Sequence, residues 1–196
     1  MEVYGESTEQ KIINASLCVL EQYGLSGTTT KKIANEANVS EVTIFRKFKN
    51  KDLLIKACKD YFVEDLLNKL DRILDFDENI ETNDYLKLIF NKIVNLSDYE
   101  LTIIKIALEE IDKVSIENNI LLKINEKLIL KLKDFFDFQI FKNRIKNVNT
   151  DVLALNVASI ILQSIILWKF YGKNLNYDIE EYTNDFLSIF DYGILV

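Results

Sequence analysis

Residues 29–48 of this chain read TTKKIANEANVSEVTIFRKF, the pattern of two short helices joined by a tight turn. Thr29 or Thr30 can cap a first helix that ends near Ala37, because a threonine hydroxyl accepts hydrogen bonds from the amides of a helix start. Asn38 follows where the chain must turn, and asparagine enters the left-handed region more readily than other residues with a side chain. The stretch therefore predicts a helix-turn-helix.

The second helix of this pair is expected over residues 41–48, with Ser40 as its cap. Ile44 and Phe48 are four residues apart, so they share one face and should point inward. Ala34 in the first helix is small enough to let the second helix cross closely. The opposite face of the second helix can then enter a DNA major groove, and it carries Glu41, Val42, Thr43, Arg46 and Lys47.

The remaining sequence shows the period of amphipathic helices. The 196 residues include no Pro and five Gly, so little interrupts a helix. We expect an all-α fold of about nine helices. Besides the pair above, helices are expected at about 7–23, 51–74, 83–97, 99–114, 117–138, 150–172 and 178–193. Residues 138–149 have no clear pattern.

The acidic stretch 75–82 is predicted to be a loop between two domains. Residues 1–55 would form the helix-turn-helix domain and residues 75–196 a helical C-terminal domain. The helix at 51–74 would join them as a lever.

The charge of the chain is distributed unevenly. Its net charge is −7, yet residues 1–60 hold nine basic and eight acidic residues, while residues 61–196 hold fifteen and twenty-three. Within residues 28–51 there are six basic and two acidic residues, a net charge of +4. A basic segment on an acidic chain favours binding of a polyanion there.

Composition argues against most enzyme classes. The chain has no His, which excludes Ser-His-Asp and Cys-His sites and removes the commonest metal ligand. Cys18 and Cys58 lie within apolar helical patterns and suit reduced core thiols. An enzyme using carboxylates, Lys or Tyr stays possible, but no motif indicates one. We expect no enzyme, no metal and no cofactor.

One stretch raises the question of a membrane. Residues 152–171 are strongly apolar, but Asn156, Gln163 and Lys169 would be costly in lipid. The polar, acidic residues 1–10 do not resemble a signal peptide. We therefore expect a cytoplasmic protein with no membrane partner.

Lys31 and Lys32 are unusual residues for the start of a helix. They lie in the first turn of the first short helix, where a cation opposes the helix dipole by roughly 0.3–1 kcal/mol. A DNA phosphate docked at that helix end would reverse the sign of the effect. Two solvated surface lysines would explain the pair equally well.

Several spaced segments together resemble the N-terminal domain of the TetR family over residues 8–58. They are Thr28-Thr29-Thr30-Lys31-Lys32-Ile33-Ala34, Ala37-Asn38-Val39-Ser40, Thr43-Ile44-Phe45, Phe48, Lys51 and Leu53-Leu54. The remainder of the chain is similar only in length and helical pattern. Two positions depart from the family: Asn38 stands where Gly is usual, and Phe45 where Tyr is usual, so a hydroxyl contact to phosphate is missing.

The resemblance implies DNA-contacting roles for individual side chains. Lys51 resembles the lysine that grips the DNA backbone beside the recognition helix, and Thr29 or Thr30 resembles a phosphate contact. Phe45 can pack against sugar or a thymine methyl. The full candidate set is Thr29, Thr30, Lys31, Lys32, Ser40, Val42, Thr43, Phe45, Arg46, Lys47 and Lys51.

The resemblance also implies a dimer built from the last two long helices and a small-molecule pocket in the C-terminal domain. The helix at 150–172 is apolar nearly all round, which independently predicts burial on two sides. Candidate interface residues are Ile161, Ile165, Tyr182, Phe186 and Ile189. Candidate pocket residues are Tyr85, Phe90, Asn125, Gln163, Trp168 and Tyr171, although ordinary core packing explains each of them too.

Three hypotheses follow. The leading one is a ligand-responsive transcriptional repressor that binds a (pseudo)palindromic DNA operator as a homodimer and responds to a small apolar effector. The second is a helical interaction protein with a degenerate helix-turn-helix, which a gel shift on DNA would distinguish. The third is an enzyme or ligand carrier, against which the absence of His weighs. The operator, the effector and the sign of regulation stay open.

Overall fold

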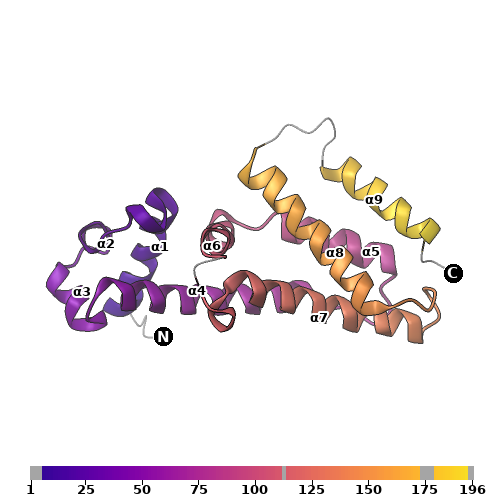
Figure 1. Cartoon of the computed structure of the whole chain (residues 1–196), viewed down its shortest axis with the longest axis horizontal. Helices are drawn as coiled ribbons and strands as arrows, with labels where there is room; N and C mark the ends of the chain where they lie inside the picture. The colour runs from indigo at the N-terminus through magenta and orange to yellow at the C-terminus, as the bar shows by residue number, and fades with distance from the viewer. Residues whose placement is uncertain (1–5, 112–113, 173–178, 194–196) are drawn as a thin grey trace, which may run out of the picture. The chain divides into compact units, whose positions relative to one another are not determined.

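The structure is a computed structural model that describes residues 6–111, 114–172 and 179–193 (Figure 1). Nine α-helices lie within these residues. The chain forms two compact units. Residues 1–66 and 98–113 make up the N-terminal unit, and residues 67–97 and 114–196 make up the C-terminal unit. The all-α architecture expected from the sequence is confirmed.

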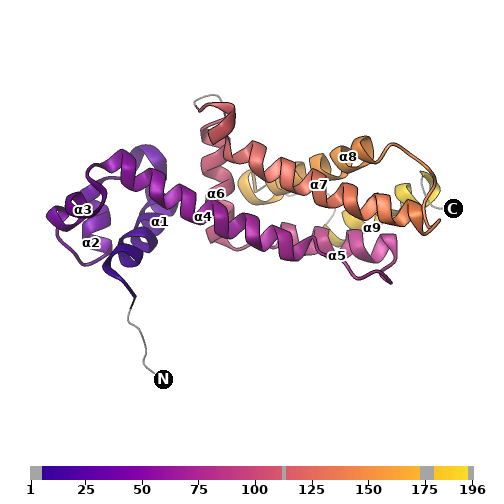
Figure 2. The same cartoon turned by 90° about the horizontal axis from the view of Figure 1, so that it is seen from below.

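The N-terminal unit holds four whole helices and the first part of a fifth. Figure 2 shows three of them grouped around the first turns of α4. Its helices are α1 (Thr8–Gly27), α2 (Thr30–Glu36), α3 (Glu41–Phe48), α6 (Asp98–Glu109) and α4 (Lys51–Ile73) up to residue 66.

Local chemistry sets the ends of α1. The Ser7 hydroxyl accepts a hydrogen bond from the Gln10 amide at 3.1 Å, as a capping residue does. Gly24 has φ +65°, a conformation that costs glycine little. The sequence predicted a helix end at this glycine. The chain kinks there and makes one more helical turn to Gly27 instead of entering a loop.

Side chains from α4 hold α6 within the N-terminal unit. Lys59 on α4 forms a largely buried ion pair with Glu110, just beyond the end of α6. The Phe62 ring meets the Tyr99 ring edge-on, with centroids 5.4 Å apart. Helix α6 also packs on α1. The two compact units thus interleave along the chain, whereas the sequence analysis placed residues 75–196 in one domain.

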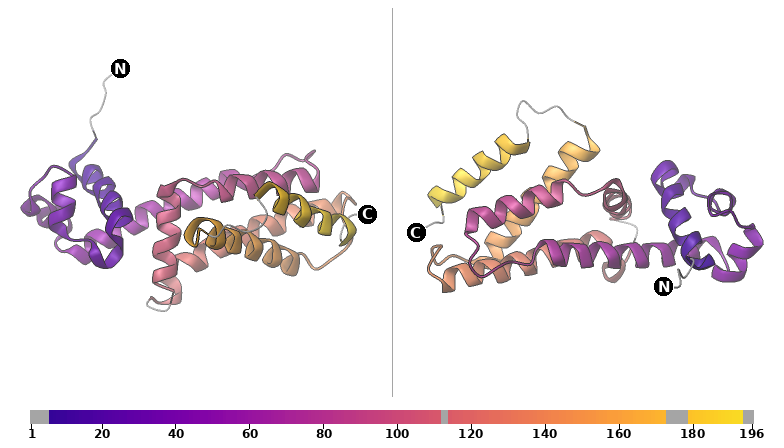
Figure 3. Two further views of the ribbon diagram at one scale, coloured as in Figure 1. Left: turned by 90° about the horizontal axis from the view of Figure 1, so that it is seen from above. Right: turned by 180° about the vertical axis from the view of Figure 1, so that it is seen from behind.

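The C-terminal unit is a helical bundle. Helix α7 packs along α8, and α5 contacts both α8 and α9. Figure 3 shows α9 running alongside α5. The elements are α5 (Thr82–Val94), the 3₁₀ turn η1 (Ile116–Asn118), α7 (Ile120–Phe141), α8 (Thr150–Ile165), the π-helical turn η2 (Ile166–Phe170) and α9 (Ile179–Gly193).

An aromatic cluster forms part of the core of this unit. The rings of Tyr85 and Phe135 stack with centroids 3.8 Å apart, and Phe76 meets both rings edge-on. The Tyr85 hydroxyl donates a hydrogen bond to the Leu74 carbonyl at 2.8 Å, which satisfies the buried polar group. Burial raises the pKa of Tyr85 far above its ordinary value.

Helix α8 has one face in the core and one face exposed. Ile161 and Ile165 are each 1% exposed, whereas Val152 and Leu155 are about half exposed. The predicted single helix over 150–172 is corrected: its last turn is π-helical, with the Tyr171 amide donating to the Ile166 carbonyl at 3.1 Å. Residues 150–170 are long and apolar enough to cross a membrane by length and composition, but their inward face packs on α7 and α5.

The two cysteines differ in burial, and this predicts different reactivity. Burial raises the pKa of Cys58 to about 11, while Cys18 is exposed. The pKa of Cys18 is also raised, first by partial desolvation and then by the carboxylates of Glu36 and Glu21. We expect a disulfide thiol reagent to modify Cys18 alone in the native protein, and faster as pH rises, because the thiolate is the nucleophile.

The absorbance of the thiolate that the reagent releases measures how many cysteines react and how fast. Cys58 should react only after unfolding in guanidinium, and Cys18→Ser should remove the reaction of the native protein. Two native thiols reacting at the same rate would contradict the packing around α4.

Candidate nucleic-acid interface

A tight turn joins α2 to α3. Asn38 has φ +52°, so the left-handed conformation expected from the sequence is confirmed. The Val39 amide donates to the Ala34 carbonyl at 2.9 Å and closes the turn. Ile33 on α2 and Ile44 on α3 are fully buried beneath it. The two helices are therefore held at a defined angle by backbone geometry and core packing.

Both helices begin with the predicted caps. The Thr29 hydroxyl accepts a hydrogen bond from the Lys32 amide at 3.2 Å, which identifies Thr29 as the cap of α2. The Ser40 hydroxyl accepts one from the Thr43 amide at 3.2 Å. The hydroxyls of Ser40 and Thr43 are 2.9 Å apart and share a further hydrogen bond. The start of α3 thus presents hydroxyl groups in a fixed arrangement.

The outer face of α3 is exposed. Val42 is 75% exposed and Phe45 is 45% exposed, although both are apolar. Arg46 and Lys47 are exposed beside them, and Thr43 is half-buried. Lys47 forms a loose ion pair with Glu9 of α1, with 3.8 Å between Nζ and Oε2. Apolar and cationic groups side by side on one exposed helix face suit contact with base edges and phosphates.

A hydrogen bond that the sequence analysis missed connects the starts of α2 and α3. The Thr30 hydroxyl donates to Glu41 Oε2 at 2.7 Å. The Thr30 hydroxyl therefore already donates its hydrogen within the protein. The Thr29 hydroxyl accepts from an amide, so its hydrogen can still be donated to a phosphate. No local spacing rule links residues eleven apart, so only the fold reveals this pair.

Lys31 and Lys32 have different surroundings. The Lys32 ammonium lies 3.6 Å from the centroid of the Tyr23 ring and donates to the Gly27 carbonyl at 2.8 Å. It thereby stabilises the end of α1. Lys31 is exposed. Of the two lysines in the first turn of α2, Lys31 is the better placed to meet a phosphate.

The connection from α3 to α4 contains a second left-handed residue. Lys49 has φ +67°, which the sequence analysis did not foresee. Asn50 then caps α4, because its Oδ1 accepts from the Leu53 amide at 2.8 Å. Lys51 is half-buried in the first turn of α4. Two cations, Lys49 and Lys51, thus follow directly after α3.

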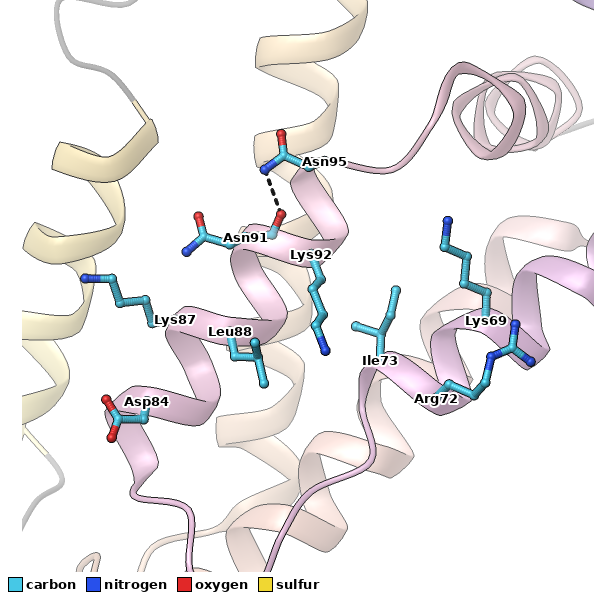
Figure 4. Close-up of a pocket in the computed structure, with 9 residues that line it drawn as sticks. All are labelled: Lys69, Arg72, Ile73, Asp84, Lys87, Leu88, Asn91, Lys92 and Asn95. Carbon is cyan, nitrogen blue, oxygen red and sulfur yellow. Dashed lines mark hydrogen bonds between the residues drawn. The ribbon is translucent and has the colours of Figure 1, made fainter.

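The predicted pocket residues lie at different depths in the C-terminal unit. Tyr85 and Phe90 are buried, Asn125 and Trp168 are half-buried, and Gln163 and Tyr171 are exposed. The Trp168 ring meets the Tyr182 ring edge-on, with centroids 4.9 Å apart. A groove between α4 and α5 is lined by none of the six (Figure 4). Their role in binding an effector stays a prediction.

The predicted interface residues also fall into two groups. Ile161 and Ile165 are buried in the core of their own unit, so they offer no surface to a partner. Ile189 on α9 is 69% exposed. Tyr182 and Phe186 are half-buried, and their rings lie 5.8 and 6.5 Å from that of Phe90. Because the two isoleucines are buried, an interface on α8 has to use the exposed face of that helix.

Comparison with known proteins gives matches for the N-terminal region. Residues 12–58 match the family of bacterial regulatory proteins, tetR family. The uncharacterized HTH-type transcriptional regulator YvkB of Bacillus subtilis (strain 168) is 52% identical over 50 residues, which are 26% of this chain and 26% of that protein. The matched part thus spans about a quarter of that relative.

Solved structures match over nearly the whole chain. A TetR transcription regulator from Haloarcula marismortui ATCC 43049 has a TM-score of 0.72 at 16% identity, covering 96% of this chain and 98% of that one. The transcriptional regulator FadR from Bacillus subtilis, in complex with stearoyl-CoA, has a TM-score of 0.68 at 18% identity, covering 91% and 95%. These likenesses show the fold.

The bond between Thr30 and Glu41 leads to a test of how α3 is held. Glu41→Ala should lower the free energy of unfolding by about 1 kcal/mol, because the half-buried Thr30 hydroxyl loses its acceptor. Glu41→Gln keeps an acceptor oxygen and should retain most of the stability. Urea denaturation followed by circular dichroism measures both. Equal destabilisation by the two changes would assign the effect to the carboxylate charge at the start of α3 instead.

Proposed function

We propose that this chain is a ligand-responsive transcriptional repressor, because its residues 12–58 match the tetR family of bacterial regulatory proteins and its fold is similar to that of a TetR transcription regulator. It binds a (pseudo)palindromic operator as a homodimer in the cytoplasm and releases it when a small effector binds. The observation that carries the proposal is the exposed outer face of α3 behind a capped, left-handed turn.

Charge supports the choice of DNA as the partner. Six of the eight charged residues in the segment 28–51 are basic, while the chain as a whole has a net charge of −7. A protein repelled by DNA over most of its surface can approach the duplex only through such a segment. A degenerate helix-turn-helix that binds protein would have no need of this asymmetry.

The contacting side chains divide into two roles. Thr29, Lys31 and Lys51 contact phosphates and set the position of α3 on the duplex. Val42, Thr43 and Arg46 reach the base edges, and Phe45 packs against sugar or a thymine methyl. Four more members of the candidate set assist from the edges of the surface: Thr30, Lys32, Ser40 and Lys47.

The proposal is tested by selecting the genomic DNA fragments that the purified protein binds and measuring their affinity by gel shift. We expect one short inverted repeat to be enriched, with two half-sites roughly one helical turn or a multiple apart. Binding with no sequence preference, or no binding, would contradict it. The genes beside the selected fragments would then indicate the effector.

A phosphate contact by Lys51 predicts a specific change in salt dependence. Lys51→Ala should weaken binding to operator and unrelated DNA alike, and the slope of log affinity against log salt should shrink by roughly one unit. Fluorescence anisotropy at several salt concentrations measures this. Lys105→Ala on α6 is the matched control, since it removes one exposed cation from the same unit.

Arg46→Ala serves as the contrasting variant. If Arg46 pairs with a guanine, Arg46→Ala should cost roughly 1–3 kcal/mol of binding free energy on the operator and little on unrelated DNA. An unchanged salt slope in Lys51→Ala would refute the phosphate contact. Equal losses on both DNAs would make Arg46 a backbone contact.

We propose that the homodimer forms through the exposed apolar residues of α8, with α9 beside them. Val152 and Leu155 are about half exposed, and Ile189 on α9 is 69% exposed. A twofold axis brings the same patch of each subunit together, so a modest apolar patch is used twice. Dimerisation also supplies the two recognition helices that two half-sites require.

Leu155→Asp should therefore split the dimer, because it places a carboxylate in the apolar interface at a cost of several kcal/mol. Operator affinity should fall sharply, since two half-sites are no longer bound together. Sedimentation and gel shift measure the two effects. Leu130→Asp on α7 changes a leucine that is 60% exposed and is the matched control. An intact dimer in Leu155→Asp would place the interface elsewhere.

We propose that the effector is a small, mainly apolar molecule bound in the C-terminal unit near Trp168. Trp168 lies in the π-helical turn η2, and such turns occur frequently at functional sites. FadR from Bacillus subtilis has this fold and is described with stearoyl-CoA, which supports binding of an organic molecule. Helix α4 supplies residues to both units and would transmit the change as a lever, with residues 75–82 as its hinge.

Trp168 is the only tryptophan in the chain, so its fluorescence should report effector binding. A compound that releases DNA should shift or quench this emission, and its effect on DNA reflects its differential affinity for the two states. Metabolites can be screened for DNA release while the emission is followed. DNA release without a change in emission, with binding unaltered in Trp168→Phe and Tyr171→Phe, would place the pocket elsewhere. Release by a divalent metal alone would contradict an apolar effector.

A further inference from the structure

A groove lies between the last turns of α4 and helix α5, both within the C-terminal unit (Figure 4). Its volume is about 1030 Å³, at the upper end of the range for small-molecule sites. Four of its nine lining residues are cationic and one, Asp84, is anionic. The cations are Lys69 and Arg72 from α4, and Lys87 and Lys92 from α5. A groove with this charge is unexpected in a chain whose net charge is −7.

Two apolar side chains, Leu88 and Ile73, lie among the polar side chains that line the groove. Figure 4 shows Leu88 and Lys92 extending from α5 toward the end of α4, from which Ile73 points toward Lys92. Leu88 is 40% exposed, so it can still cover part of a ligand. Lys87 extends to the other side of α5, toward α9, where its ammonium donates to Asn184 at 3.2 Å. The groove therefore combines an exposed apolar side chain, Leu88, with cations from two helices.

Several cations elsewhere in this unit have carboxylate partners. Lys127 and Lys131 both meet Asp71, at 3.1 and 3.0 Å, and Lys133 meets Asp151 at 2.9 Å. Arg72 and Lys92 have no hydrogen-bond or ion-pair partner in the part of the chain that the structure describes. Arg72 thus stays unpaired although Asp71 is its neighbour in sequence.

Helix dipoles give a partial account of these two residues. Arg72 lies in the last turn of α4 and Lys92 in the last turn of α5, where a cation is favourable. This explains each residue separately. It does not explain why both line one groove together with Leu88 and Ile73, where the mutual repulsion of two cations is unfavourable.

We infer that this groove is a binding site for an organic anion that carries phosphate groups and an apolar or aromatic part. The arginine fork and the lysine ammonium are the side chains that bind phosphate most readily, and the exposed Leu88 covers the apolar part. A compact anion fits better than nucleic acid, because Asp75, Asp77 and Glu78 follow directly after α4 and repel a long polyanion. The site shares no lining residue with the effector site proposed near Trp168.

The inference does not depend on the regulatory function, because the test needs no DNA. Isothermal titration of the full chain at low ionic strength compares ATP, pyrophosphate and adenosine. ATP and pyrophosphate should bind, whereas adenosine, which has the same base and sugar as ATP without phosphate, should not. Added salt should weaken binding, because the groove is open and its charges are screened. Arg72→Gln and Lys92→Gln should each weaken ATP binding roughly tenfold.

Two further variants identify where the probe binds. Lys123→Gln on α7 removes one exposed charge outside the groove and should leave ATP affinity unchanged. A loss of ATP binding in Lys51→Gln would place the probe on the basic segment of the N-terminal unit and overturn the proposal. So would the absence of binding by both phosphate probes, or wild-type affinity in Arg72→Gln and Lys92→Gln. Circular dichroism checks that the variants fold. If Arg72→Gln does not fold, the ATP affinity of Lys92→Gln decides the outcome.

Discussion

The angle between α2 and α3 is set by the left-handed backbone of Asn38, and every contact proposed for DNA depends on that angle. A residue in this conformation lets the chain reverse between two helices without a long loop. The Val39 amide closes the turn on the Ala34 carbonyl, and Ile33 and Ile44 pack beneath it. The bond from Thr30 to Glu41 then joins the starts of both helices. Backbone, core and surface thus restrain the same angle.

The cationic side chains of this molecule are of two kinds, according to whether they have a partner within the protein. Some stabilise the fold: Lys32 stacks on Tyr23, Lys59 pairs with Glu110, and Lys127 and Lys131 share Asp71. Others are exposed without such a role in the part of the chain that the structure describes: Arg46 on the outer face of α3, and Arg72 and Lys92 in the groove between α4 and α5. On an acidic chain, the second kind indicates where an anion can approach. The two anion-binding proposals rest on this distinction.

Helix α8 shows how one apolar sequence serves two surfaces. Its inward residues pack on α7 and α5, which removes Ile161 and Ile165 from solvent within a single subunit. Its outward residues, Val152 and Leu155, stay about half exposed. An apolar residue buried in its own subunit stabilises the fold, whereas one left exposed is available to a second copy. The proposed dimer therefore uses the outward residues.

The sequence by itself determined the helix-turn-helix, because its signals are local. Caps at Thr29 and Ser40 and the turn at Asn38 each depend on residues three or four apart, and the structure agrees at all three. Periodicity also determined that the chain is helical, though helix ends shifted by a few residues. Only the tertiary structure decided which face of α8 is buried, since an all-round apolar pattern contains no direction. It likewise paired Thr30 with Glu41, packed α6 on α1 and brought Arg72 near Lys92, because contacts between separate helices depend on how the helices pack and leave no periodic signal in the sequence.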